Sequence, residues 1–167
     1  MSTIEFRVVD SPVGTLTLAG RNGTLRHLRM EDQTYEPNRA GWQLNDSAFP
    51  DAVNQLAAYF AGELATFDLD LELVGTEFQR RVWAALQTIP YGETRSYGEI
   101  ALQIDAPGAS RAVGLANGRN PIGIIVPCHR VIGASGSLTG YGGGLPRKRA
   151  LLDLERSSKP AALTLFD

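Results

Sequence analysis

The chain has few of the residues that build disulfide frameworks and metal centres. Its 167 residues include one cysteine, Cys128, and two histidines, His27 and His129. One cysteine excludes an internal disulfide and suits a reducing compartment, so we expect a cytoplasmic location. Because no cluster of Cys and His has the spacing of zinc ligands, we also expect no bound metal.

Long apolar runs and signal-peptide patterns are absent as well. No stretch is long enough for a membrane helix and the first residues show no secretory pattern, so we expect no membrane partner. The apolar share of 43% and the charged share of 20% are typical of a globular protein. The length allows one domain or two small ones.

The net charge of −2 hides an uneven distribution. Residues 1–75 hold five Arg and no Lys against eleven acidic residues, whereas residues 76–167 hold eleven basic residues against seven acidic ones. A basic C-terminal part favours an anionic partner such as DNA, but the excess is small enough to be an ordinary solvated surface.

The N-terminal part has the pattern of a small α/β unit. Apolar periodicity predicts a helix over 47–61, and the polar stretch 31–43 predicts a long loop. His27 is interpreted as an exposed strand residue without a catalytic role. Turn signals separate the predicted strands, which cover residues 4–9, 15–19, 24–30 and 67–73.

The composition changes near Gly75, where a series of short helices begins. Thr76 and Ser96 each open a capping-box pattern, which predicts a helix start. A Pro-Gly turn separates the second of these helices from one over 109–117, an arrangement typical of a helix-turn-helix.

The last part of the chain predicts a hairpin and a final helix. Residues 138–140 should return antiparallel to 130–132 and form a wing. A helix over 146–156 should expose three basic residues and be followed by a loose tail over 157–167. The three are Arg147, Lys148 and Arg149.

The stretch around the single cysteine carries the chemistry. The apolar run 123–126 predicts a buried strand, which Pro127 should end. Cys128 then stands beside His129 and Arg130, and neighbouring cations lower the pKa of a thiol. Successive strand residues face opposite ways, so Cys128 and His129 need a turn or a water to interact. A reactive nucleophile and a buried structural cysteine both remain open here.

Several motifs resemble those of O6-alkylguanine-DNA alkyltransferases, also called methylated-DNA–protein-cysteine methyltransferases. The sequence PCHRVI at 127–132 is similar to the active-site signature of that family. The resemblance is strong over residues 76–157 and rests on length and element order over 1–75. Further similar motifs are IPYGET at 89–94, SY at 96–97, SRAVG at 110–114, NP at 120–121 and YGGG at 141–144.

The resemblance implies an α+β protein of two domains. Residues 1–75 would form a small RNase H-like α/β domain. Residues 76–167 would form a winged-helix-like domain, with a helix-turn-helix that binds DNA, the catalytic residues and the C-terminal tail.

The resemblance also implies DNA repair by a suicide reaction. Cys128 would take the alkyl group from O6-alkylguanine in duplex DNA after base flipping, once per molecule, with O4-alkylthymine as a further candidate substrate. His129 would act as the base through a water, and Glu155 would orient it. Tyr97 would assist the departure of guanine and turn the 3′ phosphate, and Asn120 would fix the recognition helix against the site.

The second helix of the helix-turn-helix implies a minor-groove partner. It has small side chains and no base readers, so it suits close approach to DNA of any sequence. Arg111 would fill the gap left by the flipped base; alternatively it is a solvated charge. The implied DNA-binding residues are Ser110, Arg111, Ala112, Gly114 and Tyr97. The implied guanine pocket comprises Val131, Tyr141, Gly142 and Gly143, with backbone groups of Cys128.

No cofactor is implied, and the chain is expected to act as a monomer. Some relatives bind zinc through N-terminal Cys and His ligands that this chain lacks, and Gly142 stands where some have Ser. One alternative is a lesion-recognition protein without transfer, against which Cys128 beside His129 argues. The other is a cysteine hydrolase, which would leave the charge asymmetry and the Arg111 helix unexplained.

Overall fold

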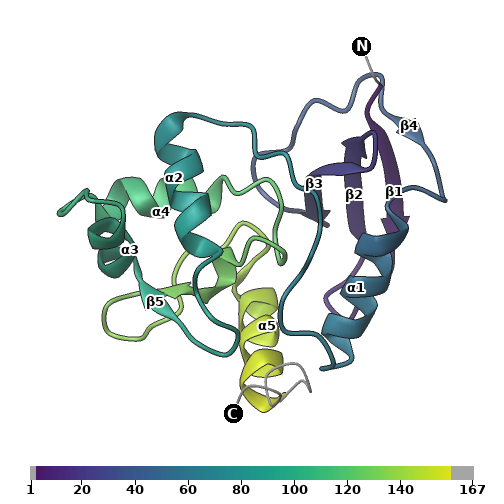
Figure 1. Ribbon diagram of the computed structural model, residues 1–167. Coiled ribbons are helices and arrows are strands. Elements are labelled where there is room, and N and C mark those ends of the chain that lie inside the picture. Colours follow the sequence, from purple (N-terminus) through teal and green to yellow (C-terminus); the bar gives the residue numbers. More distant parts are fainter. Residues whose placement is uncertain (1–2, 159–167) are drawn as a thin grey trace.

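The computed structural model describes residues 3–158 and begins with a four-stranded sheet covered by one helix (Figure 1). Strands β1 (Glu5–Val9), β2 (Leu16–Arg21) and β3 (Thr24–Met30) form an antiparallel meander, and β4 (Gln43–Leu44) pairs parallel to β1. Helix α1 (Pro50–Phe60) buries Ala52, Leu56 and Tyr59. The mixed sheet with its helix agrees with the small α/β unit expected from the sequence.

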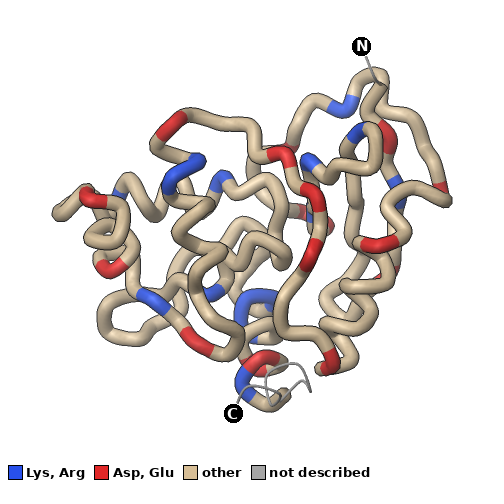
Figure 2. Tube along the Cα trace, in the orientation of Figure 1, with Lys and Arg blue, Asp and Glu red and all other residues tan. Residues whose placement is uncertain are grey.

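The predicted strand over 67–73 is wrong as a regular strand. The segment runs alongside β3, but only Leu71 forms a bridge, with Leu25. Its alternation reflects a half-buried edge, whose exposed positions carry acidic residues on the connection between α1 and α2 (Figure 2). Glu72 pairs there with Arg21 at 3.7 Å and with Arg26 at 3.3 Å.

His27 is less exposed than the sequence suggested. It is half-buried, and its ring lies 5.2 Å from that of Trp42. Burial, followed by the charges of Arg26 and Arg29, lowers its pKa to about 4. His27 is therefore a neutral packing residue at ordinary pH.

The second part of the chain is built from short helices. These are α2 (Glu77–Leu86), α3 (Tyr97–Gln103), α4 (Ser110–Gly118) and α5 (Leu145–Ser157). Both capping boxes are confirmed, because Thr76 and Ser96 each exchange two hydrogen bonds with the residue three positions on. Helices α3 and α4 pack together and form the expected helix-turn-helix. The expected tail lies, from residue 159 on, outside the described residues.

The predicted wing hairpin is wrong. Strand β6 (Val131–Ile132) pairs parallel with β5 (Arg95–Ser96), and residues 138–140 form no strand. The chain instead turns locally, with Gly133 N donating to Ser137 O at 2.9 Å. Gly136 and Gly140 have φ values of 85° and 36°, which interrupt an extended backbone.

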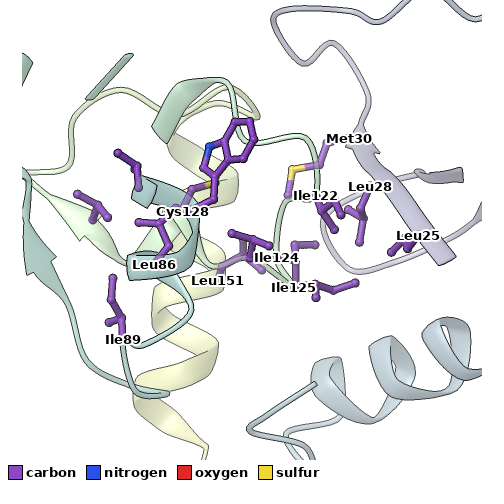
Figure 3. Packing of buried hydrophobic residues seen from close by; sticks show 14 of the residues in the cluster. Leu25, Leu28, Met30, Leu86, Ile89, Ile122, Ile124, Ile125, Cys128 and Leu151 are labelled. Atoms are coloured by element: carbon purple, nitrogen blue, oxygen red, sulfur yellow. The ribbon is translucent and has the colours of Figure 1, made fainter. Parts of the chain in front are cut away.

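One hydrophobic core joins the two parts of the chain. Leu28 of β3 lies beside Ile122, which precedes the cysteine motif (Figure 3). Leu28 N donates to Pro121 O at 2.9 Å, so the sheet also holds this segment through its backbone. Within residues 3–158, no helix is long and apolar enough to cross a membrane.

Candidate active site

Cys128 lies on a buried turn. A 3₁₀ turn over Cys128–Arg130 follows Pro127, and the cysteine is 7% exposed. Arg130 N donates to Pro127 O at 3.0 Å, which closes the turn. Cys128 and His129, which would face opposite ways along a strand, therefore lie on a turn instead.

The predicted strand over 123–126 is wrong. Ile124 has a φ of 70°, Ile125 N donates to Gly123 O at 2.8 Å, and Val126 N donates to Ile122 O at 3.0 Å. These local bonds define a tight turn. The apolar run is buried because β3 and the surrounding helices enclose it, and a continuous apolar run reports burial without fixing the backbone conformation.

Two buried asparagines hold this turn. Asn120 Nδ2 donates to Val126 O at 2.7 Å, and its Oδ1 accepts from Ile122 N at 3.0 Å. Asn117, at the end of α4, donates through Nδ2 to Cys128 O at 3.2 Å. The helix-turn-helix is thus tied directly to the cysteine backbone. Asn117 was missed because nothing in the sequence distinguishes it from a surface residue of α4.

Glu155 of α5 binds the next two residues of the turn. His129 Nε2 lies 2.7 Å from its Oε2, and Arg130 donates through Nε to Oε1 at 2.7 Å and through Nη2 to Oε2 at 3.0 Å. Tyr59 of α1 also donates to Oε2, at 2.5 Å. All four side chains are buried. Tyr59 is a further residue that the sequence did not reveal.

This network keeps the imidazole neutral and the carboxylate charged. Burial lowers the pKa of His129, and the pairing with Glu155 only partly opposes it. Burial would raise the pKa of Glu155, but its bonds to His129 and Arg130 outweigh burial and hold that pKa well below its ordinary value. With Nε2–H directed at Glu155, the buried Nδ1 of His129 is left as a proton acceptor without a partner among the described residues.

Lys148 lies inside the protein, so its predicted exposure is wrong. Its side chain is fully buried, and Nζ donates to Val131 O at 2.6 Å and to Thr139 O at 2.8 Å. Burial lowers its pKa to about 8. Helical periodicity could have placed it with Leu151 and Leu152, but a lysine is rarely buried, so the sequence signal is weak.

The electrostatics of the thiol also differ from expectation. Burial raises the pKa of Cys128, while a hydrogen bond from Asn120 and the charge of Lys148 lower it in part. Arg130 is engaged by Glu155 and by Ile89 O, at 2.7 Å, and His129 is held neutral. The cation that acts on Cys128 is therefore Lys148, which arrives from a helix twenty residues later in the sequence.

An open groove lies beside α4. Its volume is about 590 Å³, and it combines the exposed face of α4 with the glycine-rich loop before α5. Predicted residues along it are Tyr97, Ser110, Arg111, Gly114, Tyr141 and Gly142. Thr34 of the loop 31–43 also borders it, and its N donates to Gly142 O at 3.2 Å. The loop 31–43, to which the sequence assigned no function, thus forms one rim of the groove.

Other predicted residues lie away from the groove surface. Ala112 is exposed on α4, whereas Val131 is fully buried and offers its carbonyl to Lys148. Gly143 is buried, and a Cβ there would come within 2.5 Å of Met30 Sδ. Val131, Gly143 and Cys128 therefore do not line the groove.

The hydroxyl of Tyr97 is held at the edge of the groove by Thr139. It donates to Thr139 O at 3.2 Å and lies 3.3 Å from Thr139 Oγ1. Because Lys148 donates to the same carbonyl, Thr139 links Tyr97 to the buried cation.

Known proteins share this architecture over nearly the whole chain. Two family models match: "6-O-methylguanine DNA methyltransferase, ribonuclease-like domain" over residues 4–73 and "6-O-methylguanine DNA methyltransferase, DNA binding domain" over residues 77–157. The methylated-DNA–protein-cysteine methyltransferase of Mycolicibacterium paratuberculosis is 74% identical, over 98% of this chain and 99% of the relative. That of Mycobacterium tuberculosis (strain H37Rv) is 70% identical over the same shares.

Solved structures agree with these matches. The crystal structure of Mycobacterium tuberculosis OGT in complex with DNA superposes with a TM-score of 0.90 at 68% identity, covering 98% of this chain and 99% of that one. A second structure, of Mycobacterium tuberculosis O6-methylguanine methyltransferase, also has a TM-score of 0.90, at 70% identity over the same shares.

Proposed function

The chain belongs to the 6-O-methylguanine DNA methyltransferase family, and from that premise we propose how its residues perform the reaction. It is a methylated-DNA–protein-cysteine methyltransferase, which repairs DNA by moving an alkyl group onto a cysteine of its own chain. The observation that carries the assignment of the acceptor is that the chain has a single cysteine, Cys128, placed on the buried turn beside His129. Cys128 is therefore the acceptor.

The sulfur of Cys128 attacks the alkyl carbon on O6 of guanine in an SN2 step. An S–C bond forms and the C–O6 bond breaks, so the products are a thioether on Cys128 and an unmodified guanine that remains part of the DNA. The thiol proton passes through a water to Nδ1 of His129, which burial keeps neutral and whose Nε2 is directed at Glu155. Asn120 and Lys148 favour the developing thiolate.

Guanine leaves as its negative charge is neutralised. Tyr97 donates a hydrogen bond or a proton to the departing base from its place beside Thr139. One proton passes from Cys128 to His129 and one from Tyr97 to guanine, so the total charge of the site is unchanged, and exchange with water then returns His129 and Tyr97 to their neutral forms. Because no group in the site removes an alkyl from a thioether, each molecule reacts once.

DNA carrying O6-alkylguanine binds through its minor groove to α4. Ser110, Ala112 and Gly114 present small side chains there, which allow the helix to approach the sugar–phosphate backbones closely. Arg111 is exposed and takes the place of the extruded base. The open groove beside α4, with Tyr141 and Gly142 in its wall and a volume of about 590 Å³, lies within the size range of small-molecule sites and supports entry of the base there.

Two domains divide the work, with the boundary at residues 75–76, between the segments matched by the two family models. One chain supplies every group named above, so the protein acts as a monomer. A reactive thiol is preserved best in a reducing compartment, which supports a cytoplasmic location.

Mass spectrometry after reaction with a duplex containing O6-methylguanine tests the proposal. We expect one added methyl group per molecule, on the peptide that contains Cys128, with no further increase in excess DNA. Cys128→Ala should bind the same duplex and gain no mass. Lesion binding without a mass change would identify a recognition protein, and turnover of a thioester without DNA binding would identify a hydrolase.

A further inference from the structure

The Glu155 carboxylate receives a hydrogen bond from the other part of the chain. Tyr59 lies on α1, 96 residues before Glu155, and its hydroxyl donates to Oε2 at 2.5 Å in a fully buried position. The Tyr59 ring is fixed by three aromatic neighbours at centroid distances of 5.2, 5.3 and 6.2 Å: Phe60, Phe67 and Tyr91. The hydroxyl is therefore held in place, with no freedom to turn toward solvent.

Oε2 of Glu155 is also the atom that holds the imidazole. His129 Nε2 lies 2.7 Å from it, so Tyr59 and His129 share one oxygen. Each donor draws negative charge away from the oxygen and weakens its attraction for the other donor's proton. Burial, together with the charge of Glu155, raises the pKa of Tyr59 far above its ordinary value, so the phenol is always a donor.

We propose that Tyr59 is a positioning residue for alkyl transfer, which fixes Glu155 and limits how strongly that carboxylate makes His129 basic. By this route the N-terminal part of the chain takes part in the chemistry. The inference rests on the proposed function, in which His129 is the base. Arg130 binds both carboxylate oxygens, through Nε on Oε1 at 2.7 Å and through Nη2 on Oε2 at 3.0 Å, so Oε2 accepts from Tyr59, His129 and Arg130, and Tyr59 is the one donor of the three that can be removed without removing a charge or the base.

Tyr59→Phe removes the hydroxyl and keeps the ring. Without this donor, more charge stays on Oε2, Glu155 attracts the imidazole proton more strongly, and the pKa of His129 rises. Protonated His129 is not a base, so the acidic limb of the rate profile should move to higher pH. We expect single-turnover transfer from an O6-methylguanine duplex, at saturating protein, to fall roughly 3- to 10-fold on the acidic limb of the pH profile and to match the unchanged chain on its plateau.

Phe67→Leu is the matched control. It loosens the packing around the Tyr59 ring without removing a donor from Glu155. We expect it to lower the melting temperature and leave the midpoint of the pH profile unchanged. If Tyr59→Phe slows transfer equally at every pH, or leaves it unchanged, the positioning role is overturned.

A second readout separates this inference from the proposed function. The chain has two histidines, so the imidazole signals of labelled protein are few enough to assign by NMR. Protonation of His129 should begin at a higher pH in Tyr59→Phe than in the unchanged chain, whether or not DNA is repaired. Protonation at the same pH in both proteins would overturn the inference and leave the proposed function standing, whereas failure of the unchanged chain to alkylate Cys128 would overturn the proposed function.

Discussion

Replacing Lys148 with methionine tests which cation activates Cys128. The ammonium group is fully buried, donates to the carbonyls of Val131 and Thr139, and lowers the pKa of the thiol that burial raises. Methionine keeps the length of the side chain and removes its charge. The substitution therefore isolates the electrostatic contribution.

The expected effects on reactivity and stability differ in size. Opposite charges a few ångströms apart interact by about 2–4 kcal/mol at an effective dielectric near 20, so loss of half that interaction slows thiolate chemistry roughly 5- to 30-fold. Thr139 O keeps the Tyr97 hydroxyl as a donor, at 3.2 Å, and Val131 O loses its lysine partner. That loss costs about 1–3 kcal/mol and is opposed by removal of a buried charge, so the net change in stability should be below about 2 kcal/mol.

The rate of Cys128 alkylation by iodoacetamide, followed by intact mass, measures the effect without DNA. The pKa of Lys148 is about 8 in the folded protein, so its charge is present below that pH and lost above it. The unchanged chain and Lys148→Met should therefore differ most below pH 8 and converge at higher pH.

Arg149→Met is the control, because it removes an exposed cation from the same helix. Equal reaction rates for Lys148→Met and the unchanged chain at neutral pH would refute the assignment of Lys148. An equally large loss in Arg149→Met would refute it too, since the effect would then be one of general charge.

Three further substitutions probe the DNA face, the carboxylate and the glycine loop. Arg111→Ala should slow repair of duplex DNA at least about tenfold and leave the reaction with free O6-benzylguanine unchanged, because only the duplex requires base extrusion; equal losses would contradict its role. Glu155→Gln should lower the free energy of unfolding in urea by about 3–5 kcal/mol, because Arg130 stays buried without its charge partner. The pKa of Glu155 is depressed by folding, so the stability that its charge contributes is present above the unfolded pKa and is lost as pH falls through the folded pKa. If the free energy of unfolding fell by the same amount at acid pH in Glu155→Gln and in the unchanged chain, this argument would be contradicted. Gly143→Ala should lower the free energy of unfolding, measured by thermal melting, by about 1–3 kcal/mol, because its Cβ would lie 2.5 Å from Met30 Sδ. Gly118→Ala, whose Cβ would meet nothing within 4 Å, should leave that free energy unchanged. Similar losses in both variants would contradict the packing argument.

Local signals in the sequence were sufficient for much of the fold. Thr76 and Ser96 set the starts of α2 and α3, because a capping box needs only residues three positions apart. The Asn22-Gly23 turn has φ values of 53° and 77°, the left-handed conformation that a tight hairpin requires. Such features are fixed by near neighbours and are therefore legible in the sequence.

Features that depend on distant contacts were not predictable in this way. The run 123–126 is equally apolar whether it forms a strand or a buried turn, and only Asn120 and β3 decide between them. Lys148 can be buried because two carbonyls from other segments accept hydrogen bonds from its ammonium group. In the sequence, Tyr59 cannot be told from any other aromatic residue of an amphipathic helix, because its partner Glu155 lies on α5, 96 residues later. The motif around Cys128 indicated the nucleophile, but its electrostatic partners come from the tertiary fold.

The three segments that meet at Glu155 are synthesised at different times, so the site can assemble only late in synthesis. During synthesis the α1 segment with Tyr59 emerges first, the turn with Cys128 and His129 follows, and Glu155 comes last of the three. Until α5 has emerged and docked, neither Glu155 nor Lys148 is in place, so His129 has no orienting carboxylate and the thiol has no cation beside it. A nascent chain on the ribosome therefore lacks the paired His129 and Glu155, and the single reaction available to each molecule is withheld until α5 has emerged and docked.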